Sequence, residues 1–206
     1  MQRADDPATP ASAPDEDRGL VDRARAGDAG AFEALVRRYQ AWVFTLALRM
    51  VGDRGEAEDM AQEVFLKAYR GLNTFRGASR FSTWLYAIAT HHCLNHLQAR
   101  ARRPRPVGGA GAGAAAAGED PPDPVDRLPD GAPRADALLE RADLERIVQA
   151  ELQSLTEEQR AVLVLRDIQG LTYEDIAQAL GLELGTVRSR LHRARMALKA
   201  RLAPHL

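Results

Sequence analysis

Hydrogen-bond donors are concentrated on one face of the last predicted helix. Val187, Leu191, Ala194 and Leu198 recur at intervals of three or four residues, so they form a single apolar stripe. The remaining positions turn outward, and their donors suit phosphate oxygens and base edges in the major groove of duplex DNA. These outward residues are Thr186, Arg188, Ser189, Arg190, His192, Arg193 and Arg195.

This helix follows a shorter one, and the pair predicts a helix-turn-helix motif. Residues 171–181 show helical apolar spacing, and Gly181 is suited to the turn between the two helices. In such motifs the second helix enters the major groove. The chain is also free of acidic residues after Glu183. We therefore expect a duplex-binding surface here, with a merely solvated basic face as the alternative.

A second basic segment lies in the middle of the chain, because no aspartate or glutamate occurs between Arg76 and Gly118. Within it, Trp84, His91 and Asn95 are spaced to share one face of a predicted helix. Four arginines follow, at positions 100, 102, 103 and 105. An aromatic ring, polar donors and arginines fit base stacking and phosphate contacts with a single strand. A buried tryptophan with incidental polar neighbours is the alternative.

Three histidines near the only cysteine raise the possibility of a metal site. His92 and His96 are four residues apart on one helix face, and His91 is adjacent. No carboxylate lies nearby in the sequence, and Cys93 points away by helical geometry, so we predict no metal site. The chain also lacks a nucleophile motif and a phosphate-binding glycine loop. We expect no enzyme and no cofactor. A metal-dependent hydrolase built on the histidines would require stoichiometric metal in purified protein.

An acidic row lies on the outward face of an earlier predicted helix. The inward side of this helix carries Ala57, Met60, Val64 and Ala68 at helical spacing. The outward residues are Asp59, Gln62, Glu63 and Leu66. A solvated helix face explains the acids, but a leucine beside them leaves a partner helix possible.

Apolar periodicity predicts an all-α protein of two small helical domains. Residues 1–18 lack periodicity and are expected to form a disordered leader. Residues 19–103 form the first domain, and 104–134 are a flexible linker rich in glycine, alanine and proline. Residues 135–206 form a four-helix domain that contains the helix-turn-helix. Asp28, Thr156 and Thr172 are predicted N-caps, and Gly52 is a predicted helix end.

The composition indicates the cellular compartment of the protein. A single cysteine among 206 residues excludes an internal disulfide and a cysteine-rich zinc module. No apolar run is long enough to cross a bilayer, and the first residues lack a signal-peptide apolar region. We expect a reduced, cytoplasmic location without membrane insertion. Cys93 faces the core side of its helix, which favours an inert thiol over a redox sensor.

Four motifs together resemble the extracytoplasmic-function group of bacterial sigma factors. They are DMAQEVFLKAY at 59–69, FRGASRFSTWLY at 75–86, LTEEQRAVLVL at 155–165 and GTVRSRLHRAR at 185–195. The resemblance covers nearly everything outside the leader and the linker. It departs from the usual pattern at Ala87 and His91, where relatives commonly have arginine and asparagine, and at Glu183, where serine is common.

The resemblance implies a dissociable specificity subunit of RNA polymerase that directs promoter-specific initiation. By this likeness, the helix with Asp59, Gln62, Glu63 and Leu66 docks on the clamp coiled coil of the largest polymerase subunit. A further contact to the flap region and a cognate anti-sigma factor, which is often membrane-bound, are also implied.

The resemblance also implies that each domain binds a different promoter element. The first domain would open the minus-ten element and capture an unpaired base, through Phe75, Arg76, Ser79, Arg80, Trp84, His91, Asn95, Arg100, Arg102 and Arg103. The last helix would bind the minus-thirty-five element as duplex, through the outward residues of the terminal basic face. A polymerase-independent helix-turn-helix regulator is the alternative. It would leave the 59–69 motif and the Trp84 face as packing only.

Overall fold

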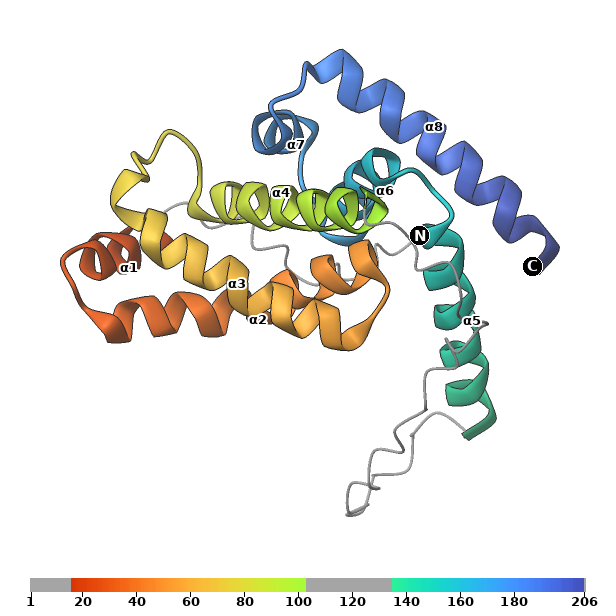
Figure 1. Cartoon of the computed structure of the whole chain (residues 1–206), viewed down its shortest axis with the longest axis horizontal. Coiled ribbons are helices and arrows are strands. Elements are labelled where there is room, and N and C mark those ends of the chain that lie inside the picture. Colours follow the sequence, from red (N-terminus) through yellow and green to blue (C-terminus); the bar gives the residue numbers. More distant parts are fainter. Residues whose placement is uncertain (1–15, 103–134, 206) are drawn as a thin grey trace, which may run out of the picture.

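The structure is a computed structural model that describes residues 16–102 and 135–205. Every regular element in these two ranges is helical, and no strand occurs in them, which confirms the all-α prediction (Figure 1). The predicted linker, 104–134, and most of the predicted leader lie outside the described residues. Within the described ranges, no helix combines the length and the apolar character needed to cross a membrane.

Three long helices build the first domain. They are α2 (Ala29–Val51), α3 (Arg54–Gly71) and α4 (Phe81–Arg102), with α1 (Glu16–Arg25) packed on α2 and the short 3-10 turn η2 (Leu72–Thr74) after α3. Apolar residues at helical spacing are buried in all three, among them Tyr39 and Val43 of α2, the predicted Val64 of α3, and Tyr86 and Leu97 of α4. The helical spacing of apolar residues therefore placed these faces correctly.

Single capping residues determine where α2 begins and ends and where α3 begins. The Asp28 carboxylate accepts a hydrogen bond from the Ala31 amide at 3.1 Å, and Asp53 accepts one from the Glu56 amide at 2.8 Å. Between them, Gly52 takes a left-handed conformation with φ of +86°, and its amide caps the Leu48 carbonyl. These contacts confirm the predicted N-cap at Asp28 and the predicted helix end at Gly52.

The helix α1 begins inside the segment expected to be a leader. Asp17 is only 6% exposed, and its carboxylate accepts hydrogen bonds from the Tyr39 hydroxyl and, at 2.6 Å, from Arg38. Val21 and Ala24 of α1 also enter the core. The leader prediction was therefore too long at its end, because a buried carboxylate satisfied by two distant residues gives no signal in local periodicity.

The second domain consists of four helices around the predicted stripes. They are α5 (Ala135–Gln153), α6 (Glu157–Leu163), α7 (Tyr173–Leu180) and α8 (Leu184–Leu202), with a π-helical turn η3 (Val164–Ile168) after α6 and the 3-10 turn η4 (Ala203–His205) at the end. Thr156 and Gln159 form a reciprocal capping box, and Thr172 caps α7 through the Asp175 amide, which confirms both predicted caps.

A buried arginine joins α6 to its surroundings. Arg160 is 4% exposed, and its guanidinium donates to the carbonyls of Leu152, Gln153 and Leu155 at 2.8–3.2 Å and to that of Met50. Burial lowers the pKa of this guanidinium. Because Met50 belongs to α2, one charged side chain ties the second domain to the first.

The two domains pack directly against each other, with α7 over α4 and α5 against the end of α2 (Figure 1). Gln149 donates to the Leu48 carbonyl at 3.1 Å, and Gln153 donates to the Arg49 carbonyl at 3.0 Å. Both glutamines therefore bond to backbone carbonyls at the end of α2, and the Leu48 carbonyl also accepts from the Gly52 amide. The buried apolar residues of the two predicted domains form one continuous cluster.

Cys93 lies in the middle of the core, as expected from its helix face. Its exposed fraction is 0%, and burial raises the pKa of its thiol to about 12. We expect the native thiol to react with Ellman's reagent near pH 8 at least about 100-fold more slowly than the thiol of the unfolded chain. The same protein in concentrated guanidinium chloride is the control, and immediate stoichiometric reaction of the native chain would contradict a buried Cys93.

Candidate nucleic-acid and partner surfaces

The basic face of α8 is built on a fully inward apolar stripe. Val187, Leu191 and Ala194 are no more than 2% exposed, and they hold the helix against α6. The predicted contact residues Arg188, Ser189, His192, Arg193 and Arg195 are exposed, and Thr186 and Arg190 are half-buried. The helix thus presents a row of donors to solvent on the side away from the core.

Two arginines of this face are engaged within the chain. Arg195 forms a two-pronged ion pair with Asp167, with one N–O distance of 2.9 Å, and the Asp167 hydrogen bond raises the pKa of Arg195. Arg190 lies 3.4 Å from the Glu158 carboxylate. The guanidinium of Arg188 instead lies 5.9 Å from the centre of the Tyr173 ring. Arg188 and Arg193 therefore remain better placed for an anionic ligand than Arg190 and Arg195.

The turn between α7 and α8 has helix-turn-helix geometry. Gly181 adopts the left-handed conformation with φ of +62°, and its amide caps the end of α7. Glu183 stands at the N-cap of α8, but its side chain makes no capping hydrogen bond. The structure thus confirms the predicted helix-turn-helix motif, and α8 begins without a side-chain cap.

An aromatic cluster supports the segment before α4. The Phe75 ring lies 5.1 Å from Trp84 and 6.0 Å from Phe81, and the Phe81 ring lies 5.7 Å from both Trp84 and Tyr39. Phe75 is 9% exposed, and Trp84 is half-buried. Phe75 therefore serves mainly to shape the loop, whereas Trp84 keeps part of its ring at the surface.

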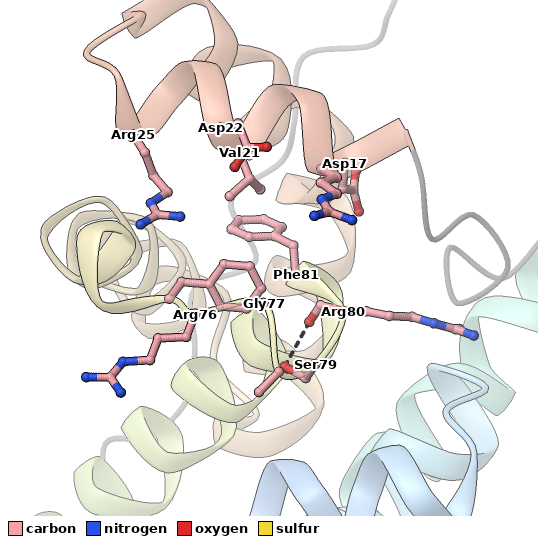
Figure 2. A pocket seen from close by; sticks show the side chains of 12 residues that line it. Asp17, Val21, Asp22, Arg25, Arg76, Gly77, Ser79, Arg80 and Phe81 are labelled. Carbon is pink, nitrogen blue, oxygen red and sulfur yellow. Dashed lines mark hydrogen bonds between the residues drawn. The ribbon is translucent and has the colours of Figure 1, made fainter.

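A pocket of about 500 Å³ lies between α1 and the loop that precedes α4 (Figure 2). Phe75 and Phe81 line it together with Gly77, whose φ is +70°. Its charged lining residues are Asp17, Arg18, Asp22, Arg25, Arg76 and Arg80. In Figure 2, the side chain of Arg80 points away from the pocket. Rings and guanidinium groups in one recess suit a nucleobase and its phosphate.

The remaining predicted contacts on α4 lie along its exposed surface. His91, Asn95, Arg100 and Arg102 are exposed, whereas Arg103 lies outside the described residues. Arg100 donates to the Glu56 carboxylate at 3.0 Å. The row is therefore open to solvent, although one of its arginines already has an anionic partner.

The histidines of α4 have a carboxylate near them that the sequence did not reveal. Glu56 of α3 approaches to 3.5 Å from His96 Nε2, which corrects the expectation that no carboxylate lies close. In the described parts of the chain, no group of three or more potential ligands is close enough to hold a metal ion.

The acidic face of α3 is exposed, as its spacing indicated. Asp59, Gln62, Glu63 and Leu66 all face solvent. Leu66 is 47% exposed, and the neighbouring Tyr69 is 54% exposed with its ring edge-on to Phe32 at 4.9 Å. Large apolar side chains beside acids are typical of a protein-binding surface. Tyr69 stands one helical turn after Leu66 and was not among the residues predicted for this face.

Two family descriptions match this chain, one for each domain. Residues 35–103 match sigma-70 region 2, and residues 145–198 match sigma-70 region 4. The RNA polymerase sigma-H factor of Pseudomonas aeruginosa is 43% identical over 93% of this chain and 96% of that relative. The chain belongs to the sigma-70 family and to its extracytoplasmic-function (ECF) group. As an ECF sigma factor, it directs promoter-specific initiation of transcription.

Other relatives of this ECF sigma factor agree. The ECF RNA polymerase sigma-E factor of Escherichia coli K12 is 40% identical over 91% of this chain and 95% of its own length. A solved structure of CnrH in complex with the cytosolic domain of CnrY is 27% identical, has a TM-score of 0.64, and covers 92% of this chain and 99% of that one. The sigma factor RpoE of Bartonella quintana, solved with the anti-sigma factor NepR, shares the fold at 21% identity and a TM-score of 0.59, over 84% of this chain and 96% of its own.

Proposed function

We propose that the exposed face of α3 is the main contact of this sigma factor with core RNA polymerase. The observation that carries this proposal is the exposure of Leu66 and Tyr69 beside Asp59 and Glu63, on a helix whose opposite side is fully packed. Apolar anchors supply most of the binding energy at protein interfaces, and the surrounding charges orient the partner. A helix of a coiled coil is a suitable partner for such a face.

In this proposal, each of the two basic surfaces binds one promoter element. The pocket between α1 and the loop before α4 takes an unpaired base of the minus-ten element, and the open row on α4 contacts its phosphates. The α8 face binds the minus-thirty-five element in the major groove, with Arg188 and Arg193 as its principal contacts. The exposed donors on α4 and α8 and the rings and guanidinium groups that line the pocket support this assignment. The alternative, a polymerase-independent regulator, would give the exposed α3 face no partner.

A cognate anti-sigma factor is a further expected partner. The structural relatives CnrH and RpoE were each solved in complex with a second protein, and for RpoE that protein is an anti-sigma factor. A protein that covers the α3 face would compete directly with polymerase, so the two partners would exclude each other.

The function is tested by run-off transcription and by capture of core polymerase. We expect promoter-specific transcripts from genomic fragments only when the chain and core polymerase are both present. Leu66→Asp is expected to weaken capture of core polymerase by roughly 30-fold or more, because it places a charge at an apolar anchor. Asp59→Ala and Gln62→Ala should weaken capture to a smaller extent.

Arg37→Asp is the matched control for Leu66→Asp, since it also adds an acid to an exposed helix position, on α2, where Arg37 pairs only with Glu33. It should leave capture within about twofold. Unchanged capture of polymerase by Leu66→Asp, Asp59→Ala and Gln62→Ala would instead favour the polymerase-independent regulator.

A further inference from the structure

The helix α1 forms one wall of the pocket that faces the loop before α4 (Figure 2). This wall is fixed to the first domain, because Val21 is 3% exposed and the buried Asp17 accepts a hydrogen bond from the Tyr39 hydroxyl. The exposed residues of α1 that line the pocket are Arg18, Asp22 and Arg25. None of them belongs to the predicted minus-ten contacts, which come from the loop and from α4.

The charged groups of this wall have no partner within the described residues. Asp22 stands four residues after Arg18 and three before Arg25, spacings that allow ion pairs on a helix, yet it forms neither pair. Arg23 on the same helix does have a partner, since it binds the Asp28 carboxylate at 2.6–2.9 Å. The three charges that face the pocket are therefore free to bind a ligand.

The loop side of the pocket supplies rings and further guanidinium groups. Phe75 and Phe81 are 9% and 4% exposed, and their rings lie 6.0 Å apart. The side chains of Arg76 and Arg80 form no hydrogen bond or ion pair in the parts of the chain that the structure describes. A recess of about 500 Å³ with apolar rings and unpaired charges at its edge has the size and chemistry of a small-ligand site.

Asp22 is the open carboxylate of this pocket. The other acid in its lining, Asp17, is already bonded to Tyr39 and Arg38. A carboxylate accepts hydrogen bonds and donates none, so it suits the exocyclic amino group of cytosine, adenine or guanine. In an unpaired thymine, the single ring N–H lies between two carbonyl oxygens, which repel a carboxylate. Asp22 should therefore disfavour thymine.

Arg18 and Arg25 are spaced to hold the strand around such a base. Seven residues of α-helix separate them, which is about 10 Å along the helix axis. Their long side chains can converge from this separation on phosphates beside one nucleotide. Contacts to phosphates position a strand, whereas a contact to a base distinguishes sequences. One face of α1 thus carries both kinds of group.

We propose that α1 is the second wall of the single-strand site, where Arg18 and Arg25 bind phosphates beside the captured nucleotide and Asp22 accepts a hydrogen bond from the amino group of its base. This inference rests on the proposed function, which places an unpaired base in this pocket. The site then prefers a base that carries an exocyclic amino group. Part of the sequence preference therefore comes from a helix outside α4 and its preceding loop.

The first test compares fluorescein-labelled oligo(dC) and oligo(dT) strands of about twelve nucleotides, bound to the full chain near pH 8 without polymerase. A homopolymer presents the same base to the pocket in every register. We expect oligo(dC) to bind roughly 5- to 10-fold more tightly. Asp22→Asn keeps the shape but can also donate to a thymine oxygen, so the two affinities should then agree within about twofold. Glu33→Gln neutralises an acid of α2 outside the pocket lining and should keep the preference.

The second test measures the phosphate contacts. Arg18→Ala/Arg25→Ala should weaken both strands by a similar factor, roughly 5- to 10-fold. It should also reduce the slope of log affinity against log salt by about 1.4, since each phosphate contact on a single strand contributes about 0.7. Arg23→Ala/Arg37→Ala removes the same two charges from α1 and α2. Both of these arginines are held in ion pairs outside the pocket lining, so affinity should stay within about twofold.

The outcomes separate this inference from the proposed function. Equal affinity of the unmodified chain for the two strands would overturn the inference, as would a preference that survives Asp22→Asn. Equal weakening by the two arginine double variants would also contradict it, because α1 would then act only through its net charge. Failure of the unmodified chain to support run-off transcription with polymerase would instead contradict the proposed function, because the strand-binding assay contains no polymerase.

Discussion

Replacing Arg160 with methionine is expected to lower the free energy of unfolding by about 3 kcal/mol. Methionine keeps most of the side-chain volume but donates no hydrogen bond, so the carbonyls of Gln153, Leu155 and Met50 lose the guanidinium donor and that of Leu152 keeps only the Leu155 amide. Chemical denaturation followed by circular dichroism measures the change.

Arg146→Met is the matched control for this loss. The Arg146 side chain is 80% exposed on α5, where it pairs only with Asp143 three residues away. We expect this substitution to change the free energy of unfolding by less than about 0.5 kcal/mol. If both variants unfold at the same denaturant concentration, the buried guanidinium does not support the joint between α5, α6 and α2.

The double substitution Arg188→Ala/Arg193→Ala is expected to reduce promoter-specific run-off transcription by roughly 30-fold or more, because each base contact of an arginine contributes about 1–3 kcal/mol. Capture of core polymerase should be unchanged, because the α3 face belongs to the first domain and both arginines belong to α8 of the second. Transcription from promoters with altered minus-thirty-five elements measures whether the lost binding is sequence-specific.

Arg190→Ala/Arg195→Ala removes the same two charges from the same helix. These arginines are held by Glu158 and Asp167, so their loss should weaken transcription by only about 3- to 5-fold. An equal loss from both double variants would mean that α8 acts through its total charge and does not read bases through Arg188 and Arg193.

Local patterns were sufficient to predict the helices and their inward faces. Val187, Leu191 and Ala194 are buried as their spacing indicated, and the caps at Asp28, Thr156 and Thr172 are present. The acidic face of α3 and the basic face of α8 followed from the same reasoning, because an outward position on an amphipathic helix is set by its inward neighbours.

Interactions between distant residues could not be predicted in this way. Arg160 and Gln169 are polar residues in a helical pattern, and nothing nearby in the sequence indicates that Arg160 bonds to Met50 or that Gln169 bonds to Tyr86 and Trp42 in the first domain. Asp17 was likewise assigned to a leader, because its partner Tyr39 is twenty-two residues away. Buried polar groups of this kind depend on tertiary packing, which periodicity does not report.

The π-helical turn η3 makes the packing of the second domain on the first sensitive to the number of residues in the turn. The backbone amide of Gln169 donates to the Val164 carbonyl, five residues earlier in the chain, at 2.9 Å. This turn therefore holds one residue more than an α-helical turn. Ile168, the last residue of this turn, is 37% exposed. Deleting one residue here would rotate Gln169 by about 100° about the helix axis. Its side chain would then lose the hydrogen bonds to the Tyr86 hydroxyl and the Trp42 carbonyl. A deletion of one residue in this turn is therefore expected to weaken the packing of the second domain on the first.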